Sequence, residues 1–125
     1  MPQAPRSIDS ALTDELADGE QPIAGRLLFA ALVNSGLAPK AHYSGGGYYV
    51  LIINTPGGQI WITDDEGQIA RPAAEHTAWL AIYIADDDET REFGRPIYTG
   101  SGNLTHAQDT VACAEAVLTS MAARW

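Results

Sequence analysis

The chain has 125 residues, a length that fits one domain, and 46% of them are hydrophobic, which is enough for a core without metals or disulfides. Its formal net charge is −9, so it lacks the clustered positive charge that phosphate-backbone binding requires. Its single cysteine, Cys113, cannot form an internal disulfide, and no apolar run is long enough to span a bilayer. We therefore exclude direct nucleic-acid binding and a membrane span, and we expect a cytoplasmic protein.

Two helices are predicted in the first third of the chain. Residues 1–6 are expected to form a flexible tail, and residues 7–125 a single domain. A short helix is predicted between Ser7 and Ala17, where apolar residues recur four positions apart. A second helix is predicted from Pro22 to Asn34. It should end at Gly36, which can adopt a left-handed conformation and would place Leu37 against Leu32.

The middle of the chain changes to the short, β-branched and aromatic runs that are typical of strands between turns. Expected strands are Tyr48–Ile53, Gln59–Thr63, Gln68–Ala70, Thr77–Ala85 and, as an edge strand because of Pro96, Arg95–Thr99. The segment Thr105–Gln108 is a capping box and predicts a last helix that runs to about Arg124. The predicted apolar stripe of that helix is Ala107, Val111, Ala114, Leu118 and Met121. The fold class is therefore α+β, with a four- to five-stranded antiparallel meander between N-terminal helices and a C-terminal helix.

Turn positions predict the register of this meander. If Asn54 pairs with Gln59, then Ile52 lies opposite Trp61, and both faces of the sheet are apolar. The expected core face carries Tyr49, Leu51, Ile53, Ile60, Ile62, Ile69, Leu80, Ile82 and Ile84. The other face, here called the predicted aromatic face, carries Tyr48, Val50, Ile52, Trp61, Trp79, Ala81 and Tyr83.

An antiparallel sheet with a solvated second face would show polar residues there. Three explanations remain open for the predicted aromatic face: helices cover it, another protein or a second copy binds it, or it lines a pocket for a small ligand. Because Trp and Tyr dominate interface hot spots, the expected function is a small acidic protein-binding or adaptor module that self-associates through this face. The expected binding residues are Tyr48, Ile52, Trp61, Trp79, Tyr83 and His42.

The partner is expected to be another protein or a second copy, with a basic rim that complements the negative chain. No catalytic, metal or cofactor constellation is visible in the sequence. His42, His76 and His106 share no metal-binding spacing, and Cys113 is expected to be a buried small hydrophobe. The sequence therefore favours a protein that is not an enzyme and has no cofactor.

Other acidic and glycine-rich segments also lack the residues of known sites. The run from Asp86 to Glu89 fails the calcium-loop pattern, because Arg91 occupies the glycine position and Ile97 the glutamate position. The segment Asp64–Gly67 is explained as a turn. Two alternatives stay open: a small-ligand-binding domain or small enzyme with an aromatic pocket, and an acidic mimic of nucleic acid that inhibits a basic protein.

Overall fold

A computed structural model describes residues 12, 22–46, 48–86 and 94–124. The predicted tail, residues 1–6, and all of the predicted helix between Ser7 and Ala17 except Leu12 lie outside the described residues. The Leu12 side chain is buried in the core. Helix α2 spans Ala24–Asn34 and helix α3 spans His106–Arg124.

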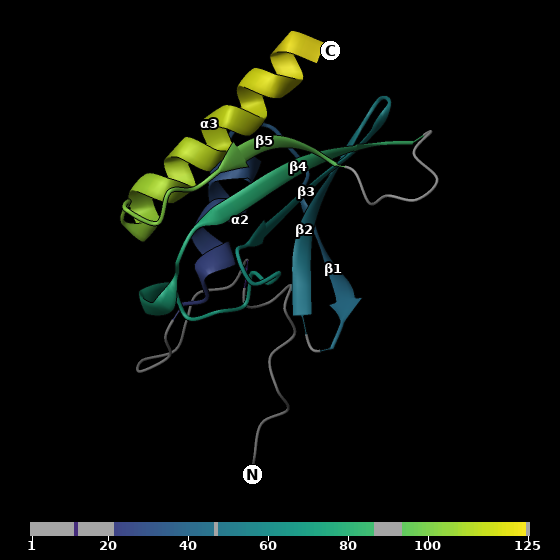
Figure 1. The fold of residues 1–125 in the computed structure, drawn as a ribbon. Helices are drawn as coiled ribbons and strands as arrows, with labels where there is room; N and C mark the ends of the chain where they lie inside the picture. Colours follow the sequence, from purple (N-terminus) through teal and green to yellow (C-terminus); the bar gives the residue numbers. More distant parts are fainter. Residues whose placement is uncertain (1–11, 13–21, 47, 87–93, 125) are drawn as a thin grey trace.

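Five antiparallel strands form one sheet in the order β1-β2-β3-β4-β5, so the predicted α+β meander is confirmed (Figure 1). The strands are β1 (Lys40–Gly45), β2 (Tyr48–Thr55), β3 (Gly58–Asp64), β4 (Trp79–Ala85) and β5 (Arg95–Thr99). A short 3-10 helix, η1 (Ala73–Glu75), precedes β4. As expected for a strand that contains Pro96, β5 lies at an edge.

The membership of the sheet differs from the prediction at two places. Strand β1 was not predicted, and Gln68–Ala70 is not a strand. The backbone groups of Ile69 are used elsewhere: its N–H donates to the Tyr49 carbonyl, and its own carbonyl accepts from the Gly25 N–H at 2.9 Å. This segment therefore caps the start of α2 instead of extending the ladder of β3.

Local signals at the helix ends are confirmed. Gly36 has φ +89°, and the Leu37 N–H donates to the Leu32 carbonyl at 3.1 Å, which closes the α2 C-terminus as a Schellman motif. At the start of α3, the Gln108 N–H donates to Thr105 Oγ1 and the Thr105 N–H donates to Gln108 Oε1, both at 3.1 Å. This is the predicted capping box.

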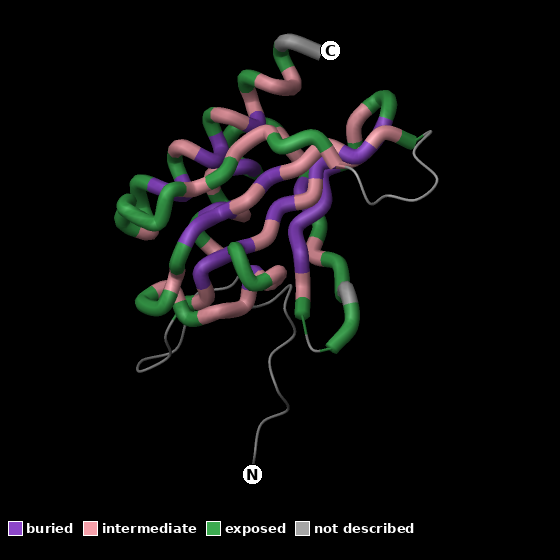
Figure 2. Tube along the Cα trace, viewed as in Figure 1, coloured by how far each residue is buried: buried purple, intermediate pink, exposed green. Residues whose placement is uncertain are grey.

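Both described helices pack on the same face of the sheet, which is the core face (Figure 1). Figure 2 shows buried positions along the central strands and exposed positions at the turns. The core is formed by Leu12, Ala24, Leu28, Leu32, Leu51, Ile53, Ile60, Ile62, Ile69, Trp79, Ala81, Cys113, Ala114 and Val117. The opposite face of the sheet, here called the outer sheet face, carries His42, Tyr48, Val50, Ile52, Trp61, Leu80, Ile82 and Ile84.

The register of β2 and β3 is as predicted, but the phase of β4 was predicted wrongly. Asn54 pairs with Gln59 and Ile52 with Trp61. In β4, however, Trp79 pairs with Asp64, which places Trp79 and Tyr83 on the core face. The aliphatic residues Leu80, Ile82 and Ile84 lie on the outer sheet face instead. The predicted aromatic face is therefore not a single surface.

The buried side of α3 was also misassigned. Ala107 and Val111 of the predicted stripe are exposed, whereas Asp109, Thr110 and Cys113 are buried. Two polar residues occupy the inward side because they bond to groups of the sheet, as described below. Ala114 of the predicted stripe is buried as expected.

Strands β3 and β4 approach so closely at Gly58 that a side chain does not fit. A Cβ at Gly58 would lie 2.2 Å from the Ile84 carbonyl oxygen. We expect Gly58→Ala to lower the free energy of unfolding by about 3 kcal/mol in urea titrations. The matched control is Gly57→Ala, whose Cβ would meet, among the described residues, the Tyr83 hydroxyl at 3.3 Å, and should cost less than about 1 kcal/mol. Equal losses for both variants would contradict this.

Candidate functional site

Four of the six predicted binding residues share the outer sheet face: His42, Tyr48, Ile52 and Trp61. His42 and Tyr48 are exposed, Trp61 is partly buried, and Ile52 is buried. Trp79 and Tyr83 belong to the core face, where Trp79 is fully buried. The structure thus places four of the six predicted binding residues on the outer sheet face, in β1, β2 and β3. The other two lie in β4, on the core face.

Trp61 is held in place on the outer sheet face by neighbours from three strands. Its indole N–H donates to Gln59 Oε1 at 3.0 Å, and Gln59 Nε2 donates to Asn54 Oδ1, also at 3.0 Å. The His42 ring lies 5.8 Å from the Trp61 ring, measured between centroids. The polar edge of the indole is therefore satisfied within the sheet, while its apolar surface remains partly accessible.

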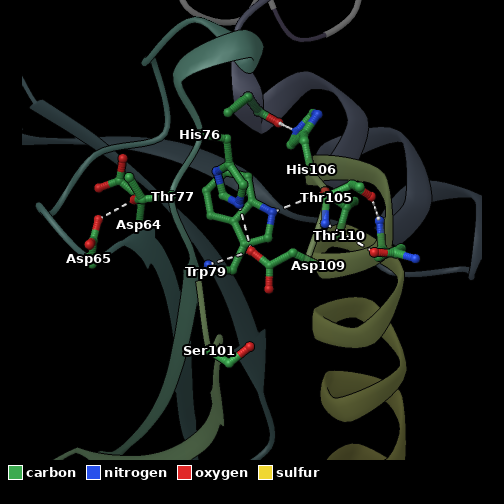
Figure 3. Close-up of polar contacts among 12 residues, drawn as sticks. Asp64, Asp65, His76, Thr77, Trp79, Ser101, Thr105, His106, Asp109 and Thr110 are labelled. Atoms are coloured by element: carbon green, nitrogen blue, oxygen red, sulfur yellow. Dashed lines mark hydrogen bonds and ion pairs between the residues drawn. The ribbon is translucent and has the colours of Figure 1, made fainter. Parts of the chain in front are cut away.

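A buried polar cluster, which sequence reasoning missed, lies between the sheet and α3 (Figure 3). It is centred on the Asp109 carboxylate. Asp109 Oδ2 lies 2.6 Å from His76 Nε2 and accepts from the Trp79 backbone N–H at 2.7 Å. Asp109 Oδ1 accepts from the Tyr98 hydroxyl. One side chain of α3 thereby binds the segment before β4, β4 itself and β5.

Two further contacts strengthen this region. The Trp79 indole N–H donates to Thr110 Oγ1 at 3.0 Å. The Nε2 of His106 lies 2.9 Å from the Ala24 carbonyl and so links the start of α3 to the start of α2. We call His76, Trp79, Tyr98, Asp109 and Thr110 the Asp109 cluster. Its only sequence signal is a pair of polar residues on the side of α3 that faces the sheet.

The His–Asp pair of this cluster is sealed from solvent. The side chains of His76 and Asp109 are 1% and 2% exposed. The Nδ1 of His76 has no hydrogen-bond partner within the part of the chain that the structure describes, and its ring packs on Trp79 with 4.4 Å between centroids. A general base must reach a proton of its substrate. Because His76 is enclosed, the pair does not face a substrate. It instead joins α3 to the segment before β4.

Cys113 lies one helical turn after Asp109 and is fully buried, as expected for a small hydrophobe. Burial raises the pKa of its thiol, and the nearby Asp109 carboxylate raises it further. The pKa of Tyr98 is raised too, by burial and then by its hydrogen bond to Asp109. Both groups are therefore held in their protonated forms, which makes Cys113 a poor nucleophile. The described residues contain no group of three or more His, Cys, Asp or Glu side chains placed to hold a metal ion.

An apolar hollow of about 290 Å³ lies on the outer side of α2. Its lining residues are Pro22, Ile23, Arg26, Leu27, Ala30, Ala73 and His106. The first backbone N–H groups of α2 do not point into it as free donors, because those of Ala24 and Gly25 donate to the carbonyls of Arg71 and Ile69. The hollow is thus suited to apolar groups rather than to an anion bound at a helix terminus.

Acidic residues are distributed unevenly along the chain. None of its 16 Asp and Glu residues lies between positions 21 and 63, where Arg26 and Lys40 are the only charged residues. We call residues 21–63 the acid-free segment; within it the structure describes α2, β1, β2 and all of β3 before Asp64. Among the described residues, the exposed large hydrophobic side chains are Leu27 (44%), Val33 (45%), Tyr43 (54%), Tyr48 (45%), Leu104 (39%) and Val111 (54%). Four of these six lie in the acid-free segment.

Comparisons with known proteins do not assign this surface. No protein-family model matches the sequence, and no significant match is found among curated proteins or solved structures. None of the described helices is long and apolar enough to cross a membrane. Function must therefore be inferred from the geometry of this chain itself.

The Asp109 cluster should make a large contribution to stability. Asp109→Ala removes the acceptor of the buried His76 ring and Trp79 N–H and of the partly buried Tyr98 hydroxyl, and we expect the free energy of unfolding to fall by about 3–5 kcal/mol. Tyr98→Phe removes one of these donors and should cost about 1 kcal/mol. Glu115→Ala, at an exposed position of the same helix, is the control and should change stability by less than about 0.5 kcal/mol. Urea unfolding followed by circular dichroism measures all three variants. If Asp109→Ala loses no more stability than the control, the Asp109 cluster does not make the expected contribution to stability.

Burial of Cys113 should make stability depend on pH above neutrality. Because its folded-state pKa is raised, the unfolded chain loses the thiol proton first, from about pH 8.5 upward. The protonated Cys113 thiol makes its full contribution to the free energy of unfolding below that pH. As pH rises, this contribution is lost by up to about 1.4 kcal/mol per pH unit. Urea unfolding between about pH 8 and pH 10 should show this slope in the wild type and a shallower slope in Cys113→Ala. Parallel slopes would show that the thiol does not titrate differently in the two states.

Proposed function

We propose that this chain is a small, non-catalytic protein-binding module that contacts its partner through the acid-free segment. The observation that carries the proposal is the coincidence of exposed apolar side chains with the absence of acidic residues. Leu27 and Val33 present apolar surface from α2, and Tyr43 and Tyr48 present aromatic surface from β1 and β2.

This combination has the composition of an interface rather than of an ordinary surface. Interface cores are depleted in Asp, Glu and Lys and enriched in Tyr, Trp and Arg. The acid-free segment holds Arg26 and one lysine, Lys40, whereas the whole chain has a net charge of −9. Fourteen of the 16 acidic residues lie at positions 9–20 and 64–92, where a partner would have to accommodate several carboxylates; between 93 and 125 the acidic residues are Asp109, which is buried, and Glu115. Approach at the acid-free segment avoids that cost.

The outer sheet face supports the same proposal from the other side of the sheet. His42 and Tyr48 are exposed there, next to the partly buried Trp61. Neither α2 nor α3 packs on this face, since both cover the core face. The aromatic surface proposed for binding is therefore smaller than the predicted aromatic face, and its members come from β1, β2 and β3.

The main alternative is an enzyme, and the Asp109 cluster is the group most similar to a catalytic arrangement. Its histidine and carboxylate are enclosed between the sheet and α3, and the Cys113 thiol beside them is kept protonated. Among the described residues that line the apolar hollow, two have ionisable side chains, Arg26 and His106. These features favour a structural role for the polar cluster and a binding role for the surface.

Site-specific photo-crosslinking in living cells tests the proposal. The residue p-benzoylphenylalanine is placed at Leu27 or Tyr48 in the acid-free segment, and at Leu104 or Val111 as matched controls. All four positions carry exposed hydrophobic side chains. We expect illumination to produce protein adducts from the first two positions and not from the controls. Absence of adducts at Leu27 and Tyr48, or equal adducts at Val111, would contradict the proposal.

A further inference from the structure

The apolar hollow beside α2 is built by parts of the chain that are distant in sequence. It is lined by residues of α2 and of the segment just before it, by Ala73 of η1, and by His106, the first residue of α3. Its volume is about 290 Å³, and an apolar cavity of about 150 Å³ already accommodates a benzene-sized molecule. The hollow therefore has the size for a small ring system.

The histidine of the hollow presents a hydrogen-bond acceptor. His106 Nε2 lies 2.9 Å from the Ala24 carbonyl oxygen (Figure 3), and because a carbonyl only accepts, Nε2 carries the ring hydrogen. In the neutral ring, Nδ1 then carries a lone pair. Within the described part of the chain this atom has no hydrogen-bond partner, and it is not one of the polar atoms that are both buried and unpaired there. His106 Nδ1 is therefore accessible to a donor from a small molecule.

Arg26 brings a positive charge to the hollow that the described residues leave unpaired. Arg71 forms ion pairs with Asp64 and Glu66, whereas Arg26 forms no ion pair within the described ranges. A guanidinium that no carboxylate holds is free to stack on the face of an aromatic ring, a contact that a saturated ring does not offer. The hollow thereby favours an aromatic molecule over a saturated one of the same size.

Charge disfavours an ionic ligand of either sign. An anion is repelled by a chain of net charge −9. A cation would lie beside Arg26 and would lose its hydration among apolar side chains. A neutral ligand avoids both costs. Its polar group has to be a donor, because His106 supplies the acceptor.

We propose that the hollow beside α2 binds a small neutral aromatic molecule that carries one N–H or O–H donor, the class to which indoles and phenols belong. The ring packs against Ile23, Leu27 and Ala30, Arg26 covers its face, and its donor bonds to His106 Nδ1. This inference goes beyond the proposed function and does not depend on it, since a ligand of this size needs no partner protein to complete its site.

A titration of the isotope-labelled chain with indole, followed by amide NMR spectra, tests the site. We expect a Kd of about 0.1–1 mM, with the shifted signals at residues 22–30, Ala73 and His106. Ala30→Phe, which fills the hollow from an exposed position of α2, should weaken binding about tenfold or more. The matched control is Val33→Phe, which adds the same ring to the same helix outside the hollow and should leave the affinity unchanged. The amide spectrum of each variant also verifies that it is folded.

Changes to the ligand test its chemical class without any change to the protein. N-methylindole lacks the donor and should bind about tenfold more weakly than indole, and the anion indoleacetate should bind more weakly than indole as well. Arg26→Met, which keeps an unbranched stem without the charge, should weaken the binding of indole about threefold. If about 5 mM indole shifts none of these signals, or if Ala30→Phe binds indole as well as the wild type does, the site is overturned. Equal affinities for indole and N-methylindole overturn the hydrogen bond to His106 and with it the ligand class.

Discussion

The packing of α3 on the sheet depends on the burial of the Asp109 carboxylate. A buried charge is tolerated only when donors surround it, and here three elements supply them: the segment before β4, β4 and β5. The donors fix the rotation of α3 about its axis, because only one orientation directs Asp109 at the Trp79 N–H. Thr110 then meets the Trp79 indole, and Cys113 and Val117 follow on the same side into the core.

Features determined by residues close in sequence could be predicted. The capping box needs only Thr105 and Gln108, the end of α2 needs Gly36, and the register of β2 and β3 follows from the short turn between Asn54 and Gln59. The shared face of Tyr48, Ile52 and Trp61 follows from that register. In each of these cases the turn or cap that decides the structure spans only a few residues. His42 joins the same face through β1, a strand that was not predicted.

The phase of β4 could not be predicted in the same way, because a long connection separates Asp64 from Trp79 and leaves either face of β4 free to turn inward. Both faces of β4 are apolar, so alternation does not choose between them. The choice depends on Asp109 and Thr110, about thirty residues later, which bond the backbone and indole N–H groups of Trp79. The exposed side of α2 was missed for another reason. The total charge of −9 does not indicate that the acid-free segment contains no acidic residue.

The way in which α2 begins has a consequence for the order of folding. Its N-cap residue, Ile23, provides no side-chain acceptor, and the Ala24 and Gly25 N–H groups instead bond to carbonyls of Arg71 and Ile69. Three strands separate these partners along the chain. During synthesis, α2 leaves the ribosome well before the segment that completes its first turn has been made. Its amino end is therefore expected to fray until β3 and the following turn have docked, so that this helix is finished late by a contact distant in sequence.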